Sequence, residues 1–74
     1  MTQIEFWMNI LGLLNHIVSR GHRFIITASS GISCEIKLIG GEWPEFTRQW
    51  ASWGGRAIQG EGEWSQYCTF RGVK

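Results

Sequence analysis

Several residue types and sequence features are scarce or absent in this 74-residue sequence. Aspartate is absent, and only one proline, two cysteines and two lysines occur. No apolar run reaches the roughly 20 residues of a membrane span, because Asn9, Asn15 and His16 interrupt the longest one. Seven Lys and Arg against six acidic residues give a net charge of +1. That balance argues against a general polyanion-binding protein, which would carry a basic excess.

The few cysteines also indicate a cellular compartment. Cys34 and Cys68 match no metal or redox spacing, and each shares a predicted strand face with apolar residues. We expect two core thiols, with a disulfide between them left open. The first apolar run begins at Ile4 without a preceding basic segment, so no signal peptide is expected. The sequence therefore predicts a protein without a membrane segment that resides in the cytoplasm.

Candidate catalytic and metal-binding groups are poorly arranged for chemistry. His16 and His22 are the only possible zinc ligands near each other, and they fall on different predicted elements. Glu42 and Glu45 flank a predicted helix start, and Glu61 and Glu63 lie in a glycine-rich turn. No glycine-rich piece matches a phosphate-binding motif. We therefore predict no enzymatic activity, no metal and no cofactor.

The segment from Thr2 to Gly21 carries the clearest structural signals. Thr2 and Glu5 form a capping box, and Gly21 suits a left-handed helix end. At 100° per residue, about half of the circumference is apolar. The predicted apolar half comprises Ile4, Phe6, Trp7, Ile10, Leu11, Leu13, Leu14, Ile17 and Val18.

After Gly21 the hydrophobic pattern alternates, which predicts a β-hairpin. The first strand is expected over His22 to Ser29, with Phe24, Ile26 and Ala28 on one face, and Ser30-Gly31 is the candidate turn. Ile32 to Ile39 is the clearest strand, with an apolar face of Ile32, Cys34, Ile36 and Leu38. This face is expected to pack on the apolar half of the first helix.

The second half of the sequence predicts a short helix and one or two further strands. Pro44 to Trp53 fits a helix with proline in its first turn, although a strand starting at Pro44 is the alternative. Trp64 to Arg71 is expected to be the last strand, with Arg56 to Gln59 as its hairpin partner or the approach to it. The predicted fold is one α+β domain spanning residues 1–74. Its N-terminal amphipathic helix packs on an antiparallel sheet of three or four strands, next to a short second helix.

Five tryptophans and five arginines are the unusual feature of the composition. Trp and Arg are enriched at the energetic centres of protein interfaces. The aromatic residues Trp43, Phe46, Trp50 and Trp53 recur at helical spacing, and a small core is not expected to hide all of them. We therefore predict a protein-binding surface formed by Trp43, Arg48, Trp50, Trp53 and Arg56.

Other functions remain open at this point. Arginines interleaved with aromatic residues also suit single-stranded nucleic acid, which is the alternative function. Self-association into a homo-oligomer is a third kind of contact that the sequence permits. Small single domains without catalytic motifs are common among mobile-element products, including phage-type inhibitors of host protein complexes such as anti-CRISPR proteins. The small size of the chain and its lack of catalytic motifs are the only grounds for this comparison, since no sequence motif supports it.

Overall fold

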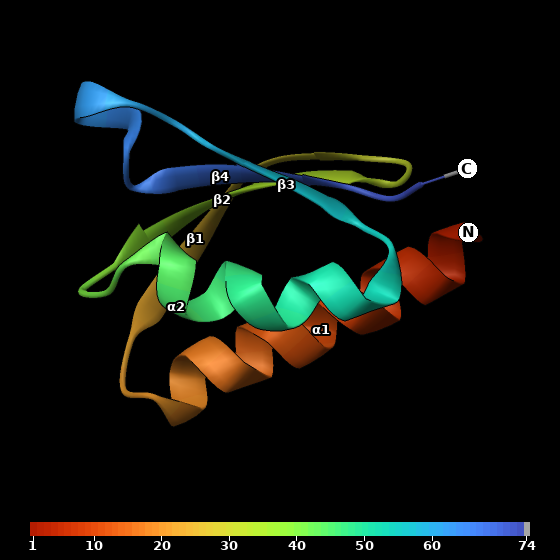
Figure 1. The fold of residues 1–74 in the computed structure, drawn as a ribbon, viewed down its shortest axis with the longest axis horizontal. Helices are drawn as coiled ribbons and strands as arrows, with labels where there is room; N and C mark the ends of the chain where they lie inside the picture. Colours follow the sequence, from red (N-terminus) through yellow and green to blue (C-terminus); the bar gives the residue numbers. More distant parts are fainter. Residues whose placement is uncertain (74) are drawn as a thin grey trace.

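One antiparallel sheet and one layer of helices make up the fold (Figure 1). The computed structural model describes residues 1–73, with side chains at all of them except positions 49, 51 and 52. The elements run α1 (Gln3–Ser19), β1 (Arg23–Ser30), β2 (Ser33–Ile39), α2 (Trp43–Thr47), the 3₁₀ helix η1 (Arg48–Trp53), β3 (Arg56–Gln59), the 3₁₀ turn η2 (Gly62–Trp64) and β4 (Tyr67–Arg71). The strand order is β1-β2-β4-β3, and every pairing is antiparallel. The predicted α+β fold is confirmed.

Helix α1 begins and ends where its capping residues predict. The Thr2 hydroxyl oxygen accepts a hydrogen bond from the Glu5 backbone N–H at 3.1 Å, which satisfies one of the free donors of the first turn. At the other end, Gly21 takes a φ of 82° and turns the chain back toward the sheet.

The buried side of α1 is narrower than the predicted apolar half. The residues that the fold buries are Phe6, Ile10, Leu13, Leu14 and Ile17. The prediction that Ile4, Leu11 and Val18 also lie in the core is wrong, because their side chains are 73%, 58% and 58% exposed. A sheet and one neighbouring helix cover only part of a helix circumference, so the remaining apolar residues of α1 stay in solvent.

The β1–β2 hairpin has the predicted strands and a different turn. Its turn residues are Gly31 and Ile32, and Gly31 takes a φ of 53°. The register shifts between Ile26 and Ala28, which places Ala28 opposite Glu35. The expectation that Ala28 shares a face with Phe24 and Ile26 is therefore wrong, because a bulge moves later residues to the opposite face.

The segment after Gly41 is helical, as expected over the strand alternative. Pro44 lies in the first turn of α2, the helix tightens to 3₁₀ geometry at Arg48, and Gly54 ends it with a φ of 83°. The segment Arg56–Gln59 is the hairpin partner of β4. The last strand begins at Tyr67 instead of Trp64, because Gly62–Trp64 forms η2.

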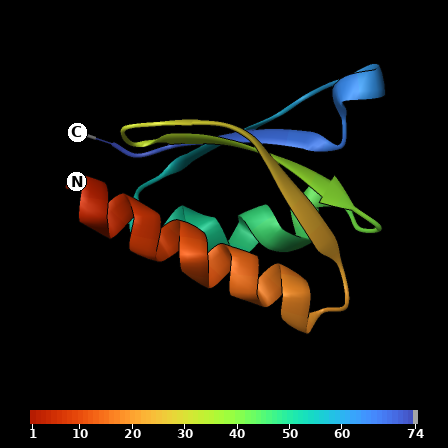
Figure 2. The same ribbon diagram turned by 180° about the vertical axis from the view of Figure 1, so that it is seen from behind.

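The core lies between the helices and one face of the sheet. In Figures 1 and 2, α1 and the α2–η1 segment lie on the same side of the sheet, and no helix of residues 1–73 covers its other side. The core of the inner sheet face consists of Cys34, Ile36, Leu38, Cys68 and Phe70. We call the uncovered side the outer sheet face. No helix among the described residues is long and apolar enough to cross a membrane.

Candidate functional site

Two of the five residues of the predicted binding surface, Trp43 and Trp50, belong to the core. Trp43 is 1% exposed, and its indole N–H donates to the Gln66 carbonyl at 2.7 Å. Trp50 is 6% exposed and meets Phe70 of β4 edge to face, with the ring centroids 4.4 Å apart. Phe46 is fully buried as well. The expectation that this aromatic face stays at the surface is thus wrong for these three residues, because large rings fill the space between sheet and helices.

The other three predicted residues do not form one surface. Trp53 is half-buried against Phe6, with the ring centroids 5.7 Å apart. Arg48 is exposed in the helix layer. Arg56 is exposed on the outer sheet face, because the next residue, Ala57, pairs with the buried Phe70. Contact of Trp53, Arg48 or Arg56 with a partner stays a prediction, but the two arginines belong to different layers of the molecule.

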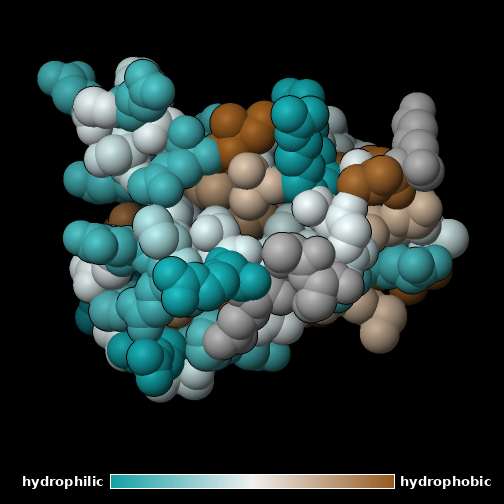
Figure 3. All heavy atoms as spheres, in the orientation of Figure 1, coloured by the Kyte–Doolittle hydropathy of each residue, from teal (hydrophilic) through white to brown (hydrophobic). Residues whose placement is uncertain are grey.

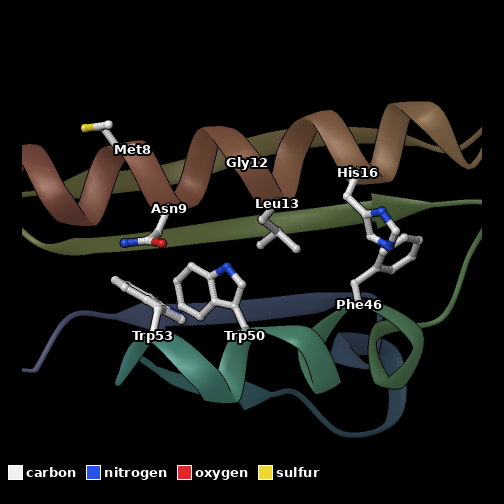
Figure 4. A pocket seen from close by; sticks show the side chains of 8 residues that line it. All are labelled: Met8, Asn9, Gly12, Leu13, His16, Phe46, Trp50 and Trp53. Carbon is white, nitrogen blue, oxygen red and sulfur yellow. The ribbon is translucent and has the colours of Figure 1, made fainter.

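A shallow groove of about 220 Å³ separates α1 from α2 and η1 (Figure 4). Its lining comprises Met8, Asn9, Gly12, Leu13, His16, Phe46, Trp50 and Trp53. In Figure 4 the side chains of Asn9, Leu13 and His16 point toward the second helix, whereas Met8 points away from it. The Asn9 amide donates to the Glu5 carbonyl at 2.8 Å, and the His16 ring lies edge-on to Phe46.

One polar group in this groove lacks a partner. Among the described atoms, the buried indole N–H of Trp53 has no hydrogen-bond acceptor. The same indole covers Gly55 so closely that a Cβ there would overlap the ring. The groove combines the polar side chains of Asn9 and His16 with an apolar and aromatic lining. Among its described residues, His16 is the one titratable side chain, so no acid–base pair is assembled there.

The two cysteines are unreactive, as their strand positions predict. Cys34 is 0% and Cys68 is 1% exposed, and both are free thiols. Burial raises the pKa of Cys34 to about 11. Burial also raises the pKa of Cys68 to about 12, against a smaller lowering by a hydrogen bond from the Ile58 backbone. Both thiols are therefore protonated at neutral pH, and the thiolate is the nucleophilic form.

His22 lies beside a carboxylate that already forms an ion pair with an arginine. The Arg20 Nη2 atom is 2.9 Å from Glu45 Oε1, whereas the His22 Nε2 atom is 4.0 Å from Glu45 Oε2. Among residues 1–73, no three His, Cys, Asp or Glu side chains gather into a candidate metal site.

The side of α1 that faces away from the core carries an apolar stripe of four residues, three of which the sequence assigned to the apolar half of the helix that packs on the sheet. The stripe comprises Ile4, Met8, Leu11 and Val18, which are 73%, 66%, 58% and 58% exposed. We call these four residues the α1 stripe. Beside it, the Trp7 indole N–H donates to the Gly31 carbonyl at 2.9 Å, which fixes the ring against the hairpin turn. The sequence indicated this exposed stripe, because the apolar arc of the helix is wider than the area that one sheet can cover.

Fold and surfaces together define a small two-layer α+β protein whose helix layer covers one side of a four-stranded antiparallel sheet. Comparison with protein-family models, curated proteins and solved structures found no match for the chain. The surfaces of the protein itself are therefore the evidence that bears on its function.

Proposed function

We infer that this protein is a non-enzymatic protein-binding module that binds an amphipathic helix of its partner on the α1 stripe. The observation that carries the proposal is the exposure of four large apolar side chains along one line of a helix. Single exposed apolar residues are ordinary, whereas contiguous apolar patches mark interaction sites.

The spacing of the α1 stripe favours a helical partner. Its members are four, three and seven residues apart, and Asn15 occupies the position that continues the pattern between Leu11 and Val18. Alternation of three and four is the seam of a coiled coil, in which side chains of one helix insert between those of another. A polar Asn within such a seam selects one register of the two helices.

The length and support of α1 suit this role. Seventeen helical residues span about 25 Å, which permits three to four turns of contact with a partner helix. The opposite side of α1 is held by the core residues Phe6, Ile10 and Ile17, each 0% exposed. The stripe is thus presented by a rigid helix that folds without the partner, which lowers the entropic cost of binding.

The partner that we propose is a host protein complex. Inhibition of a host protein complex by a mobile-element product, as anti-CRISPR proteins do, needs a compact binding surface and no catalysis. The α1 stripe supports the binding half of that proposal. The small size and the lack of a catalytic motif support the rest.

A selection experiment tests the helical partner. Peptides of 16 residues displayed as a library are selected on the immobilised protein, and binding is measured again on Leu11→Gln. Selected peptides are expected to carry apolar residues three and four apart, and to lose at least about tenfold in affinity on the variant, equivalent to ~1.4 kcal/mol. Glutamine keeps a good helix propensity, so the helix itself is preserved.

The matched control is Val73→Gln, which changes another exposed apolar residue outside α1 that is 51% exposed. This control should bind the selected peptides like the parent. Peptides without helical periodicity, or equal binding by the Leu11→Gln variant, would contradict the proposal. Sedimentation of the protein alone decides whether a second copy is the partner, since self-association would then disappear in Leu11→Gln.

A further inference from the structure

The outer sheet face carries most of the positive charge of the protein. Strand register places one cationic side chain on it from each strand: Arg23, Lys37, Arg56 and Arg71. Glu35 is the single carboxylate on the described strands of this face. Four of the seven cationic residues and one of the six acidic residues thus lie on the strands of this face, and Glu61 and Glu63 lie in the turn at its end. The net charge of the whole chain is near zero although this face is basic.

Two of these cations lie opposite each other on neighbouring strands, which does not help to stabilise the sheet. Arg56 and Arg71 are direct cross-strand partners, and like charges at such positions destabilise a sheet. Ser33 is the partner of Arg71 on its other side, and both residues line a depression of about 260 Å³ whose lining also includes Ser29, Ser30 and Glu35. The Glu35 carboxylate accepts a hydrogen bond from the Thr27 hydroxyl at 2.8 Å. An arginine pair beside serine hydroxyls suits a phosphate group.

An aromatic platform lies at the other end of the same face. Trp64 is 63% exposed, and its ring centroid lies 5.2 Å from that of Tyr67. The Nζ atom of Lys37 lies 5.6 Å from the centroid of the Tyr67 ring. Gly60 permits this arrangement, because a Cβ there would collide with the Trp64 backbone. The turn thus holds an indole in solvent against Tyr67, the ring that also lies beside Lys37.

The spacing of these groups matches an extended polyanion with flat bases. Tyr67 and Arg71 are four residues apart on β4, which places the aromatic platform and the arginine pair about 14 Å apart. Figure 3 views the sheet from its side, with hydrophilic and hydrophobic residues along the upper edge. The exposed Ile25, Ile39 and Ile58 lie on the outer face beside its cations. This outer face therefore differs in character from the α1 stripe.

We propose that the outer sheet face binds single-stranded nucleic acid. An unpaired base stacks on Trp64 and Tyr67, while Lys37, Arg56 and Arg71 neutralise phosphates. Stacking on aromatic side chains requires unpaired bases, and the basic groove beside the rings follows the backbone. Glu61 and Glu63 flank the platform in its turn and repel phosphates, so the strand runs from Trp64 toward the arginine pair. The site is separate from the α1 stripe, and neither proposal depends on the other.

Fluorescence anisotropy with a labelled 12-nucleotide single strand tests the proposal. The protein is expected to bind more tightly than about 100 µM at low salt, the weak limit of non-specific nucleic-acid binding. Neutralising three or four phosphates should reduce affinity about 20- to 50-fold between 50 and 200 mM salt. Trp64→Ala should weaken binding at least about fivefold by removing one stacking ring. Arg71→Ala should weaken binding and lower the salt slope by about 0.7.

The matched control is Arg48→Ala, which removes an exposed cation from the helix layer. It should leave affinity and salt slope within about twofold of the parent, and melting curves verify that all three variants fold. Equal losses in Arg48→Ala and Arg71→Ala would overturn the proposal, because binding would then depend on charge alone. The absence of an effect in Trp64→Ala, tighter binding of a duplex, or equal competition by an acidic polypeptide would overturn it too.

Discussion

The sheet separates two groups of aromatic residues that are alike in sequence and different in surroundings. On its inner side, Trp43, Trp50 and Phe70 pack edge to face and are almost completely buried. On its outer side, the exposed Trp64 contacts Tyr67, and Lys37 lies over the Tyr67 ring. The inner rings fill the core between the helices and the sheet, whereas Trp64 and Tyr67 are not part of that core.

This difference shows that tryptophan content does not identify a binding surface. The segment richest in aromatic residues, Trp43 to Trp53, supplies the core, and the isolated Trp64 reaches solvent. Burial on a sheet face depends on what lies across from a residue. Three experiments compare matched residues that differ in their surroundings.

The largest expected difference is between Trp50→Ala and Trp64→Ala. Removal of the buried Trp50 ring leaves a cavity and should cost ~3–5 kcal/mol, which lowers Tm by more than about 12 °C in a domain of this size. Removal of the exposed Trp64 ring should change stability by less than about 0.5 kcal/mol. Thermal melting followed by circular dichroism measures both. Similar melting temperatures for the two variants would contradict the assignment of inner and outer rings.

The second comparison uses two leucines of α1. Leu14 is 8% exposed and Leu11 is 58% exposed. Leu14→Ala should cost ~2–5 kcal/mol through lost burial and a cavity, whereas Leu11→Ala should be within about 0.5 kcal/mol of the parent. Urea unfolding measures the two free energies. A large loss of stability in Leu11→Ala would mean that the α1 stripe packs against the protein itself.

The smallest expected effect concerns the arginine pair on the outer sheet face. Arg71→Thr removes a like-charge contact with Arg56 and should stabilise the fold by about 0.2–1 kcal/mol at low salt, with the gain shrinking as salt is added. Arg23→Thr is the control, because Arg23 pairs with the uncharged Ile39 and loses the same charge. An equal gain in both variants would assign the effect to net charge instead of the cross-strand pair.

The sequence by itself determined the elements and most of their boundaries. The capping residues Thr2 and Glu5 fixed the start of α1, because a cap is a contact between near neighbours in the chain. Alternation of Cys34, Ile36 and Leu38 predicted the inner face of β2 for the same local reason. Pro44 and Gly54 bounded the second helical segment through their own backbone preferences.

Only the tertiary structure decided which apolar and charged residues meet solvent. Leu11 and Leu14 are both apolar residues of one helix, and their environments differ because the sheet covers a single side of it. Four cations gather on the outer sheet face through the register of strands that are far apart in sequence. Net charge and aromatic content average over the whole chain, so they carry no information about this separation. The two candidate binding surfaces became visible only when the strands and helices were placed against each other.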